Sequence, residues 1–109
     1  MVLDNAGNIL QFELSSETAN WEFLSRGQRR LQENYIRAGA GRITAVLLRH
    51  RKPEDGSQIK TVRDCVQFSV MWWAEGEVRT GDIHPGDKLV AFVLRWWAAC
   101  EKKSAIQSQ

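Results

Sequence analysis

The fold of this 109-residue chain is decided by the stretch Ile43-Thr44-Ala45-Val46-Leu47-Leu48. The stretch is almost entirely apolar, with Gly41 just before it and the basic run Arg49-His50-Arg51-Lys52 just after it. A short apolar run with such boundaries is typical of a strand that is buried on both faces. We therefore predict that residues 43–48 form a central strand of a sheet.

The residues before this strand are predicted to form one long amphipathic helix, at about residues 17–39. At about 100° per residue, a mainly apolar row falls on one side of this helix and a charged row on the other. Ser15 and Ser16 offer an N-cap, and Gly39 and Gly41 are typical of a helix end. We expect one row to pack on the sheet, and it consists of Trp21, Leu24, Gln28, Leu31, Tyr35 and Ala38.

Alternating apolar and polar residues predict further strands on both sides of this central unit. Residues 2–3 and 9–14 are separated by residues 4–8, in which asparagine and glycine supply the positive φ angles of a hairpin turn. Residues 66–72 alternate in the same way, and residues 77–80 are predicted to form a short strand. Between these strands, residues 52–58 have the composition of an exposed loop.

The apolar segment at about residues 88–100 is compatible with a strand or with a helix. A helix would begin near Pro85, a residue favoured in the first turn. However, the segment shares the pattern V-x-F-x-x-x-W-W-A-x-x-E with residues 66–77, at an offset of 24 residues. Because residues 66–72 have a clear strand pattern, this similarity favours a strand, with a helix as the alternative.

Together these elements predict an α+β fold in a single domain, residues 1–103, followed by a frayed polar tail at residues 104–109. The expected architecture is a mainly antiparallel sheet of four to six strands, with the helix at residues 17–39 packed on it. The composition agrees with one globular domain, since 43% of the residues are hydrophobic and 26% are charged.

The sequence offers no catalytic or cofactor motif. The glycines next to Arg42 precede a strand instead of opening a helix, so they lack the context of a phosphate-binding loop. His50 and His84 have no further ligands at metal-binding spacing. Cys65 and Cys100 are expected to be free thiols that pack as small hydrophobic residues. We therefore expect no enzyme activity, no catalytic residue, no cofactor and no metal.

Membrane association is not expected either. No apolar run approaches the roughly 20 residues of a membrane span. The first residues also lack the basic region and the apolar region of a signal peptide. The sequence therefore predicts a cytoplasmic protein.

The five tryptophans are more than a core of this size requires, and four of them form the adjacent pairs 72–73 and 96–97. Because neighbouring residues of a strand point to opposite faces, each pair would place one ring in the core and one outside. We predict that Trp73 and Trp97 are exposed and contact a partner, since tryptophan is enriched at binding hot spots. The alternative is that all five rings are buried.

Basic residues concentrate in residues 22–52, which carry eight bases and two acids, although the net charge of the chain is only +2. Arginines on the charged side of the predicted helix are candidates for docking on a protein. The alternative is a solvated helix surface with the ordinary ion pairs Glu22–Arg26 and Glu33–Arg37. The protein-binding candidates are Arg26, Arg29, Arg30 and Arg37, together with Trp73 and Trp97. A phosphate-binding face for nucleic acid would use Arg42, Arg49, Arg51 and Lys52.

These features predict a small, non-catalytic protein-interaction module. Short intracellular chains without catalytic motifs are often adaptors, inhibitors or accessory proteins, including products of phages and mobile elements. A homodimer is a close variant, because an uncovered edge strand or a Trp-rich face pairs readily with a second copy. The alternative is a nucleic-acid-binding module, with arginines on phosphates and tryptophans stacked on bases.

Overall fold

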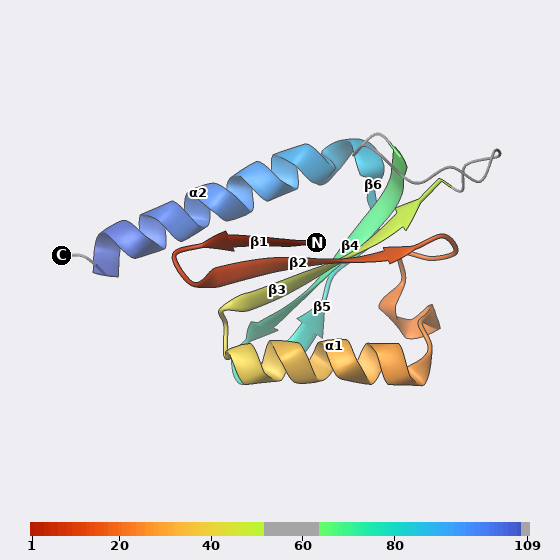
Figure 1. The fold of residues 1–109 in the computed structure, drawn as a ribbon, viewed down its shortest axis with the longest axis horizontal. Helices are drawn as coiled ribbons and strands as arrows, with labels where there is room; N and C mark the ends of the chain where they lie inside the picture. Colours follow the sequence, from red (N-terminus) through yellow and green to blue (C-terminus); the bar gives the residue numbers. More distant parts are fainter. Residues whose placement is uncertain (52–63, 108–109) are drawn as a thin grey trace.

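A computed structural model describes residues 1–51 and 64–107. In these ranges the chain forms one six-stranded sheet, two α-helices and two single-turn 3-10 helices (Figure 1). The strands are β1 (Val2–Asn5), β2 (Asn8–Ser15), β3 (Ile43–His50), β4 (Cys65–Ala74), β5 (Glu77–Thr80) and β6 (His84–Pro85). The helices are η1 (Trp21–Phe23), α1 (Arg26–Gly39), η3 (Gly86–Lys88) and α2 (Leu89–Gln107).

The strand order in the sheet is β1-β2-β3-β4-β5, and β6 pairs with the first half of β4. Strands β2 and β3 are parallel, because α1 carries the chain back across the sheet between them. All other neighbouring pairs are antiparallel. The predicted α+β class is confirmed, and the sheet is mixed, with one parallel pair.

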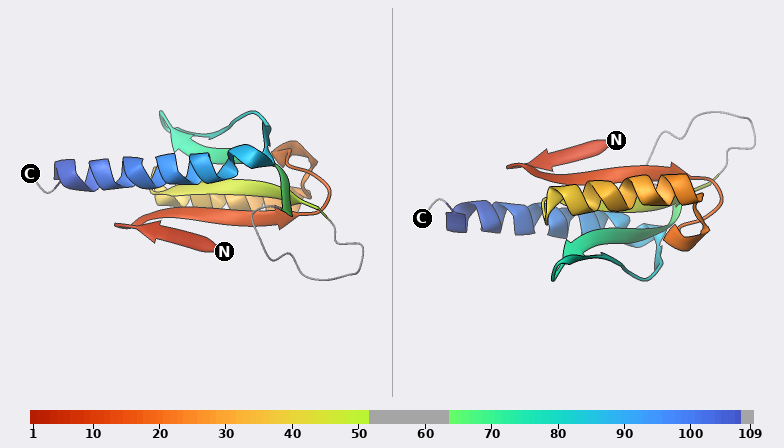
Figure 2. Two further views of the ribbon diagram at one scale, coloured as in Figure 1. Left: turned by 90° about the horizontal axis from the view of Figure 1, so that it is seen from above. Right: turned by 90° about the horizontal axis from the view of Figure 1, so that it is seen from below.

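The sheet is the middle of three layers, with α1 on one face and α2 on the other (Figures 1 and 2). Strand β3 is central, and its residues 45–48 are all buried, as the sequence predicts. Successive residues of β3 point to opposite faces and so belong to different cores. Ala45 and Leu47 pack with Ile36 of α1, whereas Val46 and Leu48 pack with Leu89 of α2.

Strands β1 and β2 form the predicted hairpin. Its turn residues are Ala6 and Gly7, with φ angles of 54° and 83°, which are the values that a tight two-residue hairpin turn requires. Asn5 does not supply a positive φ angle. Its side chain turns to α2 instead, and Nδ2 donates to the carbonyl oxygen of Trp97 at 3.3 Å.

The expectation of a strand at residues 88–100 is wrong, because these residues belong to η3 and α2. The segment differs from β4 in the residues at the end of the shared pattern. Strand β4 ends at the Glu75-Gly76 turn, whereas the second copy continues into alanines and charged residues that favour a helix. The row that faces the sheet has helical spacing and consists of Leu89, Phe92, Val93, Trp96 and Cys100.

The helix expected at residues 17–39 is shorter than predicted. It begins at Arg26, after the N-cap Ser25, and Trp21 lies in the separate turn η1. Trp21 is buried against the sheet from that turn. It therefore does not set the rotation of α1 about its axis.

The buried side of α1 also differs from the expected one. Gln32 and Ile36 are buried, whereas Leu31 and Tyr35 are 52% and 47% exposed. The expected row includes Trp21, which lies outside the helix. Without that anchor, the one strongly apolar position that contacts the sheet is Ile36, and α1 turns to bury it.

Helix α2 extends past the strands, so the molecule is elongated, with principal dimensions of 52 × 28 × 20 Å (Figure 1). The helix continues through Gln107, into the segment expected to be a frayed tail. Within residues 1–51 and 64–107, neither α1 nor α2 combines the length and the apolar character of a membrane-spanning helix. The loop expected at residues 52–58 lies outside the described residues.

The rotation of α1 is tested by a matched pair of alanine substitutions. Ile36→Ala should lower the free energy of unfolding by about 2–5 kcal/mol, because this side chain is fully buried. Leu31→Ala should lower it by less than about 1 kcal/mol, since this side chain is largely exposed. Urea unfolding followed by circular dichroism measures both values. A larger loss for Leu31→Ala than for Ile36→Ala would contradict the observed rotation.

Candidate functional site

The outward side of α1 carries a row of arginines. At the start of the helix, Oγ of Ser25 accepts a hydrogen bond from the amide of Gln28 at 3.3 Å. On the side that faces the sheet, Nε2 of Gln32 donates to Oε2 of Glu13 on β2 at 3.2 Å, and Ile36 fills the core. These contacts fix the rotation of α1. The arginines that are then exposed are Arg26, Arg30 and Arg37.

The ion pair within α1 is not one of those expected from the sequence. Nε of Arg29 lies 2.9 Å from Oε1 of Glu33. Arg29, a predicted protein-binding residue, is therefore half-buried beside the sheet and already paired. Glu33 was expected to pair with Arg37, and it is engaged by Arg29 instead.

The other arginines of α1 have no carboxylate partner in the described ranges. Glu22, the expected partner of Arg26, lies in η1 before the helix begins. Nη1 of Arg37 donates to the neutral Oδ1 of Asn34 at 3.2 Å. Among the residues that the structure describes, no ion pair includes Arg26, Arg30 or Arg37. Three positive charges are therefore exposed along one side of the helix.

Two apolar side chains expected in the core are also exposed on α1, on the flank of the helix opposite the arginine row. Leu31 and Tyr35 are one helical turn apart and both are exposed. We call the combined surface the α1 face; it consists of Arg26, Arg30, Leu31, Tyr35 and Arg37.

A signal for this surface is present in the sequence. Ser25 is followed three residues later by Gln28, which is the pattern of a capping box and begins the helix at Arg26. A helix that begins there need not include Trp21 in its apolar row. The residues Leu31 and Tyr35 then become free to face the solvent.

The two tryptophans predicted to contact a partner lie on opposite sides of the sheet. Trp73 of β4 packs against the core under α1, beside its cross-strand neighbour Val78, and is half-buried. Trp97 of α2 is 40% exposed, and its ring meets the ring of Trp96 edge-on, with 6.2 Å between centroids. Trp97 is therefore exposed, on a helix instead of the expected strand. Trp73 is half-buried instead of exposed, because its ring packs with Val78 in the core under α1.

The structure does not bring the nucleic-acid candidates together. Arg42 lies just before β3, whereas Arg49 and Arg51 lie at its far end. The 8 residues of the extended strand hold its two ends roughly 25 Å apart. Lys52 lies outside the described residues. The arginines of this group therefore do not form one continuous patch.

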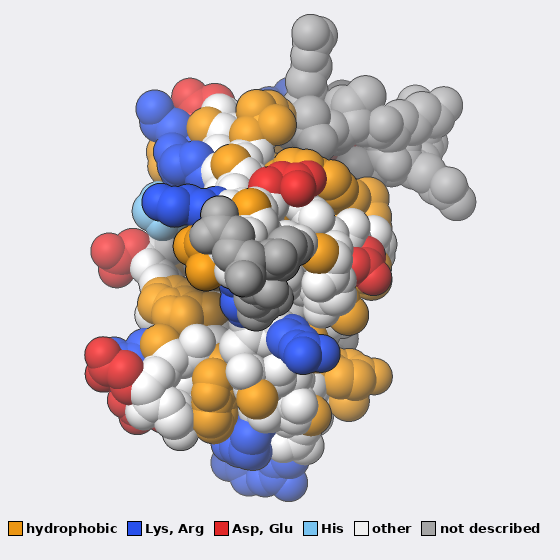
Figure 3. Space-filling model, turned by 90° about the vertical axis from the view of Figure 1, so that its left-hand side faces the viewer, with side chains coloured by type: hydrophobic (Ala, Val, Ile, Leu, Met, Phe, Trp, Pro, Cys, Tyr) orange, Lys and Arg blue, Asp and Glu red, His pale blue; other side chains and the backbone are white. Residues whose placement is uncertain are grey.

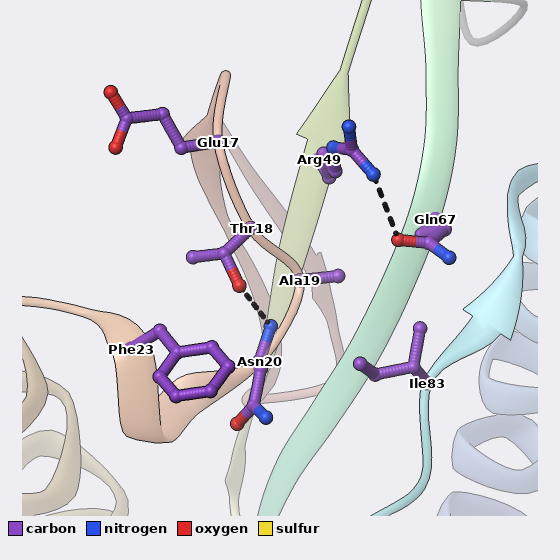
Figure 4. A pocket seen from close by; sticks show the side chains of 8 residues that line it. All are labelled: Glu17, Thr18, Ala19, Asn20, Phe23, Arg49, Gln67 and Ile83. Carbon is purple, nitrogen blue, oxygen red and sulfur yellow. Dashed lines mark hydrogen bonds between the residues drawn. The ribbon is translucent and has the colours of Figure 1, made fainter.

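Arg49 instead lines a pocket of about 380 Å³ on the α1 side of the sheet (Figure 4). Its Nη1 donates to Oε1 of Gln67 on β4 at 3.3 Å. The facing wall is the loop before η1, where the hydroxyl of Ser69 donates to the carbonyl oxygen of Ala19 and so ties the loop to the sheet. The rim carries Glu17, Phe23 and Ile83.

The pocket combines both signs of charge with exposed apolar side chains. Glu17 and Arg49 supply the charges, and Phe23 and Ile83 are exposed at its mouth. This lining suits a hydrogen-bonding side chain of another protein next to an apolar one. It adds a polar recess near the N-terminal end of α1.

The two thiols are free, as the sequence predicts, and Cys100 is buried whereas Cys65 is half-buried. Burial raises the pKa of Cys65, and its Sγ donates to the carbonyl oxygen of Gln67 at 3.5 Å. Burial also raises the pKa of Cys100, against a smaller opposing effect of Lys103. In residues 1–51 and 64–107, no three His, Cys, Asp or Glu side chains come together as a metal site.

Comparisons with known proteins give no match, so a function has to be assigned from the surfaces of the chain itself. The chain matches no protein-family model, no curated protein and no solved structure. The α1 face carries exposed charges and exposed apolar side chains on one helix.

The raised thiol pKa values predict slow alkylation of the folded protein. Only the thiolate reacts, and a raised pKa lowers the thiolate fraction at a given pH. At about pH 8, iodoacetamide should label Cys65 and Cys100 more slowly than a peptide thiol, and the rate should rise with pH. In urea without reductant, both should be labelled. Mass spectrometry counts the labels; rapid labelling of folded Cys100 would contradict its burial, and no label in urea would indicate a disulfide.

Proposed function

We propose that this protein is a small, non-catalytic interaction module that docks on an acidic surface of a partner protein through the α1 face. The proposal is carried by Arg26, Arg30 and Arg37, which are exposed without carboxylate partners in the described part of the chain. Like charges four residues apart destabilise a helix. Carboxylates of a partner would remove this repulsion, so binding would stabilise an arrangement that is unfavourable in the free protein.

The apolar part of the α1 face supports the same proposal. Leu31 and Tyr35 are exposed on the same helix, on the flank opposite the arginine row. Tyrosine and arginine are enriched among the residues that dominate interface energies, and surrounding apolar contacts exclude water from them. A partner that spans the outward side of α1 would therefore contact both the arginine row and the apolar pair.

Because the α1 face has both charged and apolar side chains, added salt should affect the association and the dissociation of a complex differently. Attraction between the arginine row and an acidic surface accelerates association, and added salt screens it. Apolar contacts at Leu31 and Tyr35 are insensitive to such screening. A complex at the α1 face should therefore form more slowly at high salt but persist once formed, as expected of an adaptor, an inhibitor or an accessory protein.

Nucleic-acid binding is the alternative. Its candidate residues Arg42, Arg49 and Arg51 lie at the two ends of β3, and Arg49 is held by Gln67 within a pocket. Phosphate contacts would also make affinity fall steeply with salt. The separation of these residues favours docking on a protein, and nuclease treatment during partner capture distinguishes the two functions.

The proposal is tested by capture of partners on the immobilised protein, with nuclease treatment and quantitative mass spectrometry. The wild type should retain one or more proteins after nuclease treatment. The variant Arg26→Glu with Arg30→Glu should lose those proteins at least tenfold, because it reverses the charge of the α1 face. Its melting temperature should hardly change, since both side chains are exposed.

The matched control is Lys88→Glu with Lys103→Glu. It makes the same change in net charge, at exposed positions on the α2 side of the sheet. This control should retain the same proteins as the wild type. Equal loss of the captured proteins from both variants would show that only the net charge matters. Capture that disappears with nuclease would establish nucleic-acid binding instead. Either result would overturn the proposal.

A further inference from the structure

The two edges of the sheet differ in how they are protected. The β5 edge carries charges, since Nη2 of Arg79 lies 3.0 Å from Oε2 of Glu75 and 2.9 Å from Oε1 of Glu77. Charged side chains of this kind discourage another strand from pairing with an edge. The β1 edge has one charged residue, Asp4, and the exposed apolar side chain of Val2. It is the less protected edge of the described sheet.

The main chain of β1 offers hydrogen bonds along this edge. The β1–β2 register closes at Asn5↔Asn8, and the carbonyl oxygen of Met1 accepts from the amide of Phe12 at 2.9 Å. Hydrogen-bonded and non-bonded pairs alternate in an antiparallel ladder. Residues 1, 3 and 5 therefore bond to β2, and the N–H and C=O groups of Val2 and Asp4 point outward.

Helix α2 presents a second apolar row, which does not face the sheet. It consists of Val90, Leu94 and Trp97, of which Leu94 is 64% exposed. A helix that is apolar on more than one side is normally covered on more than one side. Figure 3 shows hydrophobic side chains at the surface in the upper part of the molecule, where α2 lies.

The apolar row of α2 adjoins the β1 edge. Nδ2 of Asn5 lies 3.3 Å from the carbonyl oxygen of Trp97 and 3.4 Å from Oε1 of Glu101. Leu3 packs against the core beneath α2. The open strand edge and the exposed helix row therefore form one continuous surface, which we call the β1–α2 edge.

We propose that the β1–α2 edge binds a second copy of this chain, as a two-fold dimer in which two β1 strands pair antiparallel about Leu3. Val2 of each copy would lie opposite Asp4 of the other, and their outward N–H and C=O groups would exchange hydrogen bonds. Leu3 would lie opposite Leu3 of the second copy. The two α2 helices, on the same face of the extended sheet, would cover each other's exposed rows.

Two features favour a second copy over an unrelated partner. The register about Leu3 is self-complementary, because it sets each Asp4 against Val2 and not against another acid. The second feature is the size of the contact: a stable interface buries roughly 800 Å² per partner. Neither the four-residue strand nor the three-residue apolar row supplies this area alone, so a two-fold contact has to use both elements of each copy.

The proposal is tested by sedimentation velocity on the full chain and on two α2 variants. The wild type should be dimeric at about 10–100 µM, a range that detects micromolar dissociation constants. Leu94→Lys should raise the dissociation constant at least tenfold. Ile106→Lys should not, because Ile106 is equally exposed, at 62%, on the same helix but outside the row. Circular dichroism should show unchanged helix content in both variants.

A cross-link tests the register independently. Residues opposite each other at a non-hydrogen-bonded antiparallel site have Cα atoms about 4.5 Å apart, which is within the range of a disulfide. Leu3→Cys should therefore give a covalent dimer on mild oxidation. Glu77→Cys on the β5 edge and the unmodified chain should not.

Three results would overturn the proposal. A wild type that stays monomeric at about 100 µM would exclude a dimer of this strength. A dimer that survives Leu94→Lys would place the contact elsewhere, and so would a Leu3→Cys chain that cross-links no faster than Glu77→Cys. None of these results bears on the α1 face, which lies on the other side of the sheet.

Discussion

The structure depends on one constraint, which is that β3 has no side exposed to solvent. Its residues 45–48 are buried on both faces, so a layer of side chains must cover each face of the sheet. The parallel pairing of β2 with β3 meets half of this requirement, because the crossover between them is α1. Helix α2 meets the other half from the C-terminal side. Because α2 is longer than the strands it covers, its C-terminal end projects past them. The apolar row Val90, Leu94 and Trp97, on the flank of α2 toward β1, stays exposed.

The elements that could be predicted from sequence are those whose burial pattern is local. The run at residues 43–48, the alternation in β2 and β4 and the glycine-containing hairpin turn each indicate one structure. The segment at residues 88–100 could not be assigned in this way, because its apolar residues satisfy both periods. Its resemblance to β4 favoured the wrong choice. The outcome depended on the helix-favouring residues after Trp97 and on a sheet face that needed cover.

The candidate site could be predicted only in part. The arginines of α1 could be predicted as surface residues because they are charged. Whether Arg26 pairs with Glu22 depends on where the helix begins, because Glu22 lies outside a helix that begins at Arg26. One residue, Trp21, decided that question, since including it in the helix placed Leu31 and Tyr35 in the core. The burial of Trp73 depends on β5 and α1 together, and such long-range packing leaves no local trace in the sequence.

A dimer through the β1–α2 edge would also fix how the two α1 faces are placed relative to each other. Opposite residues of an antiparallel pair point to the same face of a sheet. A dimer built through β1 would therefore place both α2 helices on one face of a continuous sheet and both α1 faces on the other. Two basic surfaces held side by side on a rigid support would bind a partner with two acidic sites, and the second contact would form at high effective concentration. Weak docking at each α1 face would then be sufficient for stable binding.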